Sequence, residues 1–234
     1  MVPNRSNPIL ISFSGMDGSG KSTQIELLCA SLVSAGLHVS RVTFWDDVVG
    51  FSKWRAGFSH KFLKSTGEIG APGKPARRND KNNRAWYLLL ARSGLYLLDA
   101  WNVRSAVNRA RNSTASVVVF DRYIYDQLAT LPMNSVTKAY ARLVLSIAPK
   151  PDIALVLDAQ PEVARERKPE YPIDFLHKYR ASYISLCRLA NLLLIRPGTV
   201  EEVEAAIAER VYERCGVNRC KQASVADLPS TTAA

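Results

Sequence analysis

The chain has 234 residues, 47% of them hydrophobic and 22% charged, which suffices for one globular core and excludes disorder throughout. No apolar run approaches the ~18 residues of a membrane span, and residues 1–7 are polar, so we expect a cytoplasmic protein with no membrane partner. The net charge of +10 suits nucleic acid or several phosphate groups. Because no arginine–aromatic nucleic-acid signature is present, we favour phosphate and expect no nucleic-acid partner.

The start of the chain predicts a strand, a helix and a second strand. Residues 8–14 form a short apolar run, which is typical of a buried strand. Residues 22–35 repeat apolar side chains at helical spacing and stop at Gly36. Residues 38–44 are rich in β-branched side chains and predict the second strand. A strand–helix–strand unit of this kind predicts a parallel pair.

Residues 45–82 differ from their surroundings, because they hold several glycines and prolines and the basic run 74–81. We expect a short helix near 51–64, followed by a loop. That loop is either an ordinary solvated insertion or a flap over a substrate.

The remaining sequence alternates helices with apolar strands. Strands are predicted at 116–120, 153–157 and 192–195, and helices at 83–112, 135–147, 161–168, 173–190 and 199–214. Together the elements predict an α/β fold, a doubly wound five-stranded parallel sheet with helices on both faces. We expect one domain over residues 1–215 and a disordered tail over 216–234.

Residues 15–23 hold a glycine, four residues and then glycine-lysine-serine, between a predicted strand and a predicted helix. This spacing is typical of a P-loop, whose backbone N–H groups cradle phosphate oxygens, and the alternative is a chance glycine-rich turn. We expect Lys21 to neutralise the β and γ phosphates of ATP, Ser22 to bind Mg²⁺, and Thr23 to lie near the α-phosphate. The predicted nucleotide-binding residues are Gly15, Met16, Asp17, Gly18, Ser19, Gly20, Lys21, Ser22 and Thr23.

Charged residues follow two later strands, where ligands of such sheets bind. Asp121 ends the strand at 116–120 and is a candidate magnesium ligand, and Arg122 can grip a phosphate with two hydrogen bonds. Arg165 and Arg167 lie on the helix after the strand at 153–157 and can place positive charge over a transferring phosphate. The alternatives are a carboxylate that caps a turn and arginines that are only solvated.

These motifs resemble the thymidylate kinase family. The resemblance rests on residues 15–23, on Asp121-Arg122-Tyr123, and on Leu157-Asp158 followed by Pro161-Glu162-Val163, in the family's order and approximate spacing. It implies that Asp17 approaches the substrate sugar or phosphate and that Arg122, with Arg92, binds the phosphate of a nucleotide acceptor. It also implies that Asp121 lies near magnesium, that Arg167 belongs to a lid over ATP, and that the protein is a homodimer.

The acceptor half departs from the family pattern. Residues 44–50 replace the family's Thr-Arg-Glu-Pro-Gly-Gly stretch, Gln127 and Thr130 stand where the base is read, and the lid at 168–172 is short. A glutamine amide both donates and accepts, so Gln127 can read a pyrimidine edge.

We therefore expect ATP-dependent phosphorylation of a nucleoside monophosphate, dTMP first. One alternative is a P-loop kinase of a nucleoside or another small alcohol, which would need a general base from Asp46, Asp47 or Asp121. The other alternative is a switch protein that binds a nucleotide but transfers no phosphoryl group to a small acceptor. Lys21, Asp121, Arg122 and Arg167 are the predicted catalytic residues.

Overall fold

The computed structural model describes residues 7–48 and 86–216, with side chains from Ser93 onward in the second stretch. The strands in these residues are β1 (Ile9–Ser14), β2 (Val39–Thr43), β3 (Val117–Asp121), β4 (Ile153–Leu157) and β5 (Leu193–Ile195). The helices are α1 (Lys21–Ser34), the single π-helical turn η1 (Phe44–Val48), α3 (Trp86–Arg111), α4 (Ile124–Leu128), α5 (Ser135–Ile147), α6 (Pro161–Arg167), α7 (Ile173–Ala190) and α8 (Val200–Cys215).

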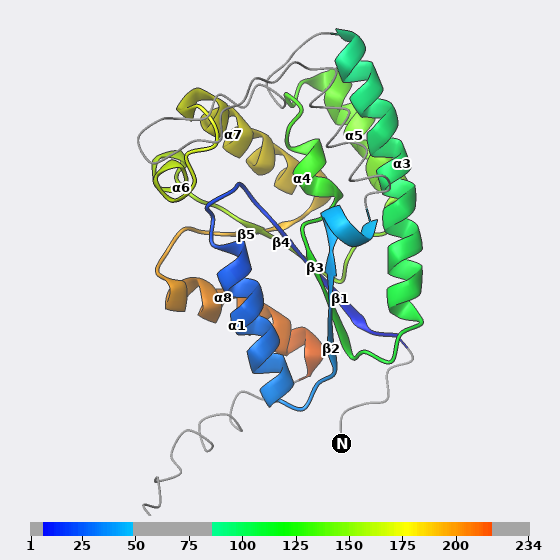
Figure 1. Cartoon of the computed structure of the whole chain (residues 1–234), viewed down its shortest axis with the longest axis vertical. Helices are drawn as coiled ribbons and strands as arrows, with labels where there is room; N and C mark the ends of the chain where they lie inside the picture. Colours follow the sequence, from blue (N-terminus) through cyan, green and yellow to red (C-terminus); the bar gives the residue numbers. More distant parts are fainter. Residues whose placement is uncertain (1–6, 49–85, 217–234) are drawn as a thin grey trace, which may run out of the picture.

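All five strands run parallel in one sheet, in the order β2-β3-β1-β4-β5 (Figure 1). β1 is the central strand: Ile9 lies opposite Val117 of β3, and Ile11 lies opposite Ile153 of β4. The chain thus runs from β1 to one edge of the sheet and later crosses to the other. The fold class predicted from the sequence is confirmed.

Helices cover both faces of the sheet, because the strands are apolar on both sides. Leu10 of β1 joins the core packed under α3, α4, α5 and α7, whereas Ile11 joins the core under α1 and α8. Figure 1 shows α1 and α8 together on one side, away from α3 and α5. Among the described helices, none is long and apolar enough to cross a membrane.

Most predicted elements match the structure closely. The predicted bounds of α5, β4 and α7 coincide with the observed ones, and the other described strands and helices agree within three residues. Thr199 caps α8 as predicted, its side chain accepting from the Glu202 N–H at 3.2 Å. Two short helices, η1 and α4, were not predicted. The helix expected near 51–64, most of the 45–82 segment, and the tail beyond residue 216 lie outside the described residues.

Candidate functional site

The carboxyl ends of the three inner strands bring the predicted motifs to one edge of the sheet. The register sets Phe13 opposite Asp121 and Ser14 opposite Val156. The loop that starts at Gly15 therefore leaves the sheet beside Asp121 of β3 and beside Asp158, which follows β4. Residues far apart in sequence meet here because parallel strands end at the same edge.

The loop from Gly15 to Gly20 has a backbone that only glycine accommodates easily. Gly18 and Gly20 have φ of 86° and 87°, in the left-handed region. A Cβ on Gly15 would lie 2.5 Å from the Leu157 carbonyl oxygen, and one on Gly18 would lie 2.5 Å from that of Ala164. The loop backbone is thus pressed against β4 and α6, so side chains cannot fill the space that the loop encloses.

The loop leads into α1, whose first turn exposes backbone N–H groups. Among the described residues, no side chain caps the N-terminus of α1, and its first turn holds no acidic residue. Ser22 and Thr23 are exposed there. Uncapped N–H groups and the positive end of the helix dipole favour an anion at this point.

Lys21 is buried within the loop, with its side chain folded back onto the backbone. Its Nζ donates to the carbonyl oxygens of Gly15 and Met16, both at 2.8 Å. Burial, and then the positive charge of Arg122, lower the pKa of Lys21 from 10.5 to about 8. Nearby carboxylates, of which Asp126 has the largest effect, act in the opposite direction and raise that pKa. The ammonium is satisfied by acceptors that phosphate oxygens could replace.

Arg122 lies against the loop in a strained backbone conformation. Its φ is 72°, which is uncommon for a residue with a side chain, and its N–H donates to the Phe13 carbonyl at 2.9 Å. The guanidinium pairs with Asp17 of the loop and, through Nη1 at 3.2 Å, with Asp126. Burial acts to lower the pKa of Arg122, but the carboxylates of Asp126 and Asp17 outweigh it and raise that pKa above its ordinary value.

Asp126 is a functional candidate that sequence reasoning missed. It is 3% exposed and lies on α4, where its carboxylate accepts from Arg122 and from the Tyr183 hydroxyl at 2.9 Å. No local pattern points to it, because Arg122 lies before the first residue of α4 and Tyr183 lies on α7, far along the chain.

Asp121 and Arg167 lie on either side of the loop. Asp121 is half-buried and forms an ion pair with Arg41 of β2. Arg167 is exposed at the end of α6, and its Nη1 donates to the Gly18 carbonyl at 3.3 Å. Sequence reasoning also missed the two-bond pair of Arg180 with Asp158, at 2.7 and 2.6 Å, which ties α7 to the end of β4.

The remaining predicted substrate contacts are placed differently from the loop residues. Gln127 is buried, and its Nε2 donates to Asp99 of α3 at 2.7 Å, while its Oε1 has no partner among the described residues. Thr130 donates to the Gln127 carbonyl at 2.7 Å. Arg92 lies on α3, at a position where side chains are outside the described residues.

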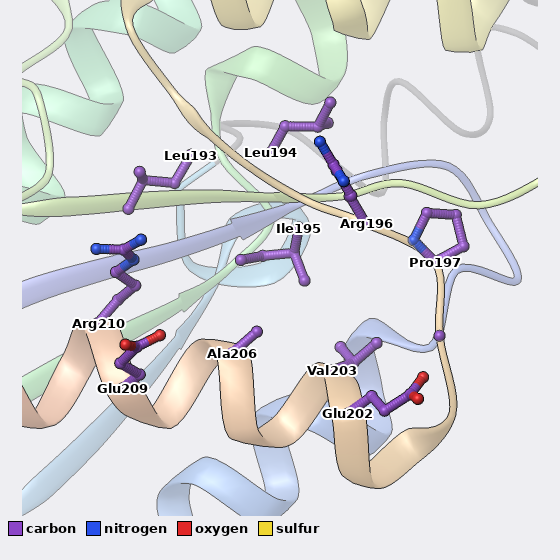
Figure 2. Close-up of a pocket in the computed structure, with 11 residues that line it drawn as sticks. Leu193, Leu194, Ile195, Arg196, Pro197, Glu202, Val203, Ala206, Glu209 and Arg210 are labelled. Atoms are coloured by element: carbon purple, nitrogen blue, oxygen red, sulfur yellow. The ribbon is translucent and has the colours of Figure 1, made fainter.

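A groove of about 400 Å³ runs between the edge strand β5 and α8 (Figure 2). Its lining mixes apolar side chains with charged ones at its rim: Leu193, Leu194, Ile195, Arg196, Pro197, Gly198, Glu202, Val203, Ala206, Glu209 and Arg210. None of the site residues predicted from the sequence lines it.

Comparison with known proteins supports the resemblance to thymidylate kinases. A protein of Aeropyrum pernix, provisionally named as a thymidylate kinase, is 29% identical over 228 residues, covering 90% of this chain and 99% of the relative. Similarly named proteins of Saccharolobus solfataricus and Archaeoglobus fulgidus are each 26% identical, covering 80% and 85% of this chain and 87% and 92% of their own lengths. The resemblance to thymidylate kinases is confirmed. No protein-family model matches the chain.

These relatives carry the resemblance beyond the short motifs. The similarity covers most of the chain, 90% of it for the protein of Aeropyrum pernix. The relatives are named as kinases, which are phosphotransferases, so the enzyme class expected from the sequence is confirmed.

Proposed function

We propose that this protein transfers the γ-phosphoryl group of ATP to a nucleoside monophosphate, with dTMP as the first candidate. The observation that carries the proposal is the position of Arg122, which is held against the phosphate-binding loop by Asp17 and Asp126. A guanidinium at this position would give the site a second phosphate-binding group beside the loop. The similarity to proteins named as thymidylate kinases supports dTMP among nucleotides.

The loop residues would bind the ATP phosphates. Backbone N–H groups of the loop and of the first turn of α1 would bind phosphate oxygens, and the Lys21 ammonium would exchange its two carbonyl acceptors for them. Arg167, exposed beside Gly18, would cover the γ-phosphate from the α6 side. Little covalent chemistry is required, since positioning and charge neutralisation supply most of the rate.

Ser22 and Asp121 are the residues that would hold Mg²⁺. The Ser22 hydroxyl is exposed in the first turn of α1, and Asp121 ends the strand next to β1. In residues 7–48 and 93–216 no cluster of three or more acidic, His or Cys side chains could hold a metal. This fits magnesium, which is bound through few protein ligands and otherwise by waters and phosphates. When bound, the ion would neutralise part of the negative charge on the phosphate groups.

A monophosphate acceptor explains the basic character of this edge. Its phosphate oxygen is already anionic, so it can form the new bond to the γ-phosphorus while the bond to the β–γ bridging oxygen breaks, with no general base. Arg122 would bind that acceptor phosphate, with Asp17 nearby and Arg92 of α3 as a second cation. Gln127 stays a candidate for contact with the base. The rival acceptors are a nucleoside or another small alcohol.

The test is release of ADP from Mg-ATP with a panel of nucleoside monophosphates, nucleosides and simple alcohols. We expect release with dTMP or dUMP, and loss of at least a thousandfold in the Lys21→Ala variant. Release only with an unphosphorylated acceptor would overturn the monophosphate proposal but keep the kinase class. Bound ATP without acceptor-dependent release would favour a nucleotide-binding switch protein.

We also propose that the protein forms a homodimer through α3. Leu98 and Trp101 lie one turn apart on this helix and are 60% and 64% exposed, whereas its opposite face is buried in the core. Two large apolar side chains at this spacing form a patch that a second copy would cover.

Analytical ultracentrifugation tests the dimer. We expect wild-type protein to sediment as a dimer and the Trp101→Glu variant as a folded monomer. Val33→Glu is the matched control, because Val33 is 59% exposed on α1, across the sheet from α3. A monomeric wild type, or a dimer that survives Trp101→Glu, would contradict the proposal.

A further inference from the structure

We propose that Asp126 is a positioning residue that holds the Arg122 guanidinium at the phosphate-binding loop, with Tyr183 of α7 as its second anchor. The inference rests on the role proposed above for Arg122 and adds the residue through which that arginine is held. Asp126 itself is buried and would touch neither ATP nor the acceptor.

The Asp126 carboxylate accepts hydrogen bonds from four groups in three parts of the chain. Oδ1 accepts from Arg122 Nη1 at 3.2 Å, from the Tyr183 hydroxyl at 2.9 Å and, weakly, from the Gly15 N–H at 3.4 Å. Oδ2 accepts from the Tyr123 N–H at 3.2 Å. A carboxylate buried this completely is stable only when its acceptor sites are filled. The side chain therefore has one preferred position, and so do the groups bonded to it.

Arg122 has two carboxylate partners that differ in burial. The Asp17 side chain is 16% exposed on the loop, whereas the Asp126 side chain is 2% exposed beneath it. An arriving phosphate competes more easily for the exposed partner, since the buried pair has no access to water. The guanidinium has five N–H groups, so Nη1 can stay on Asp126 while the others turn to a phosphate. Asp126 thus supplies the fixed point.

The backbone of Arg122 shows why a fixed point is needed. A left-handed φ of 72° at a non-glycine residue is unfavourable and persists only where the surroundings determine it. The pair with Asp126 closes a ring from Arg122 through one turn of α4, which stabilises this conformation. Loss of the carboxylate would release both the backbone and the guanidinium.

Tyr183 connects this support to α7, the helix that follows the arginine-bearing α6. Burial, and then the Asp126 carboxylate, raise the pKa of Tyr183 well above its usual value, so its hydroxyl remains a donor. Tyr179, one turn earlier, is also buried, and its hydroxyl bonds the backbone carbonyl of Asp126 at 3.2 Å and lies 3.1 Å from the Tyr183 hydroxyl. Only Tyr183 donates directly to the carboxylate, so we expect the loss of the Tyr179 hydroxyl to act on Asp126 only through Tyr183.

The first experiment reads the position of Arg122 without any activity. Full-length protein is treated with an arginine-specific dicarbonyl reagent, and modification of Arg122 is followed by peptide mass spectrometry. The reagent attacks the unprotonated guanidine, so pairing with a carboxylate slows it. We expect Asp126→Asn to speed modification at least fivefold, Tyr183→Phe about twofold to fivefold, and Tyr179→Phe less than twofold. We expect the largest effect from Asp126→Asn, because asparagine has no negative charge and its amide N–H groups would face the Tyr123 N–H in place of an acceptor.

The second experiment uses a double-mutant cycle on kcat/KM for the acceptor. We expect Asp126→Asn to lower it tenfold to a hundredfold, mainly through the acceptor KM, while the KM for ATP changes less than threefold. In an Arg122→Lys background, Asp126→Asn should lower kcat/KM for the acceptor by a further factor of less than two. The effects of two substitutions that disrupt the same contact are not additive. A residue that serves only folding would lower both backgrounds equally.

Each outcome decides one of the two proposals. Unchanged modification of Arg122 in Asp126→Asn, or additive losses in the cycle, overturns the role of Asp126. If wild-type protein phosphorylates no nucleoside monophosphate, the proposed function fails. The rates of Arg122 modification still test whether Asp126 positions Arg122, because they do not depend on activity. If Asp126→Asn does not fold, as judged by thermal melting, Tyr183→Phe gives the answer, because it removes a donor to the same carboxylate, and modification of Arg122 less than twofold faster in that variant overturns the role of Asp126.

Discussion

Lys21 carries a titratable charge in a place that water hardly reaches. The pKa of Lys21 is about 8 in the folded chain, where burial lowers it, and 10.5 in the unfolded chain. Between these values the unfolded state binds more protons, so stability rises with pH, and below pH 8 the buried charge is a constant penalty. We expect Lys21→Met to raise the free energy of unfolding at pH 7 by roughly 1–3 kcal/mol while abolishing turnover.

Urea unfolding at pH 7 and at pH 10 measures this effect. The difference between the variant and the wild type should shrink at pH 10, where the wild-type lysine has become neutral in the folded state. Lys21→Arg serves as a control, because its charge remains at both pH values. Equal differences at both pH values, or a less stable methionine variant, would show that the charge is not what limits stability here.

The residue scale also shows what sequence can reveal about the site. The placement of Lys21 could be predicted because its motif is local: the loop and the start of α1 are consecutive in the chain. Asp126 could not, since its partners come from Gly15, Arg122 and Tyr183, and only the folded sheet brings them together. Gln127 illustrates the same point, because its pairing with Asp99 depends on how α3 packs against α4.

At the scale of elements, the close approach of the loop to α6 gives a matched pair of glycines. Gly18 and Gly20 share nearly the same left-handed φ, but a Cβ would meet the Ala164 carbonyl at Gly18 and nothing within 4 Å at Gly20. We expect Gly20→Ala to lower the free energy of unfolding by about 1–2 kcal/mol from conformation alone. Gly18→Ala should lose about 1–3 kcal/mol more, because the two backbones must separate.

Urea titration of both variants in parallel measures the difference, with the m-value as a check that each still unfolds in one step. Equal losses would mean that α6 moves away from the loop without strain. Such a result would show that α6 and the loop move independently of each other.

Periodicity accounts for the elements that were predicted and for those that were not. α7 repeats its buried side chains over several turns, and α5 separates one apolar face from a polar one, so both could be bounded from the sequence. All five residues of α4 are buried, polar and apolar alike, so its sequence shows no division into a buried and an exposed face. η1 is also only five residues long, and a single turn has too few residues to show a period.

For the whole molecule, alternating strands and helices predicted the parallel sheet but not its strand order. The order depends on which strands pair across long stretches of chain, and each pairing is decided by packing of both faces at once. The central position of β1, between β3 and β4, is therefore a result of the structure.

That central position has a consequence for how the protein is made. β1 leaves the ribosome first, yet one of its neighbours starts at Val117 and the other at Ile153. The strand has no partner until β3 has been synthesised, and its other side stays unpaired until β4 has followed. The phosphate-binding loop that hangs from it acquires its supports in the same order, Arg122 first and α6 later. A nascent chain should therefore gain the ability to hold a nucleotide late and abruptly, once β4 and α6 have emerged.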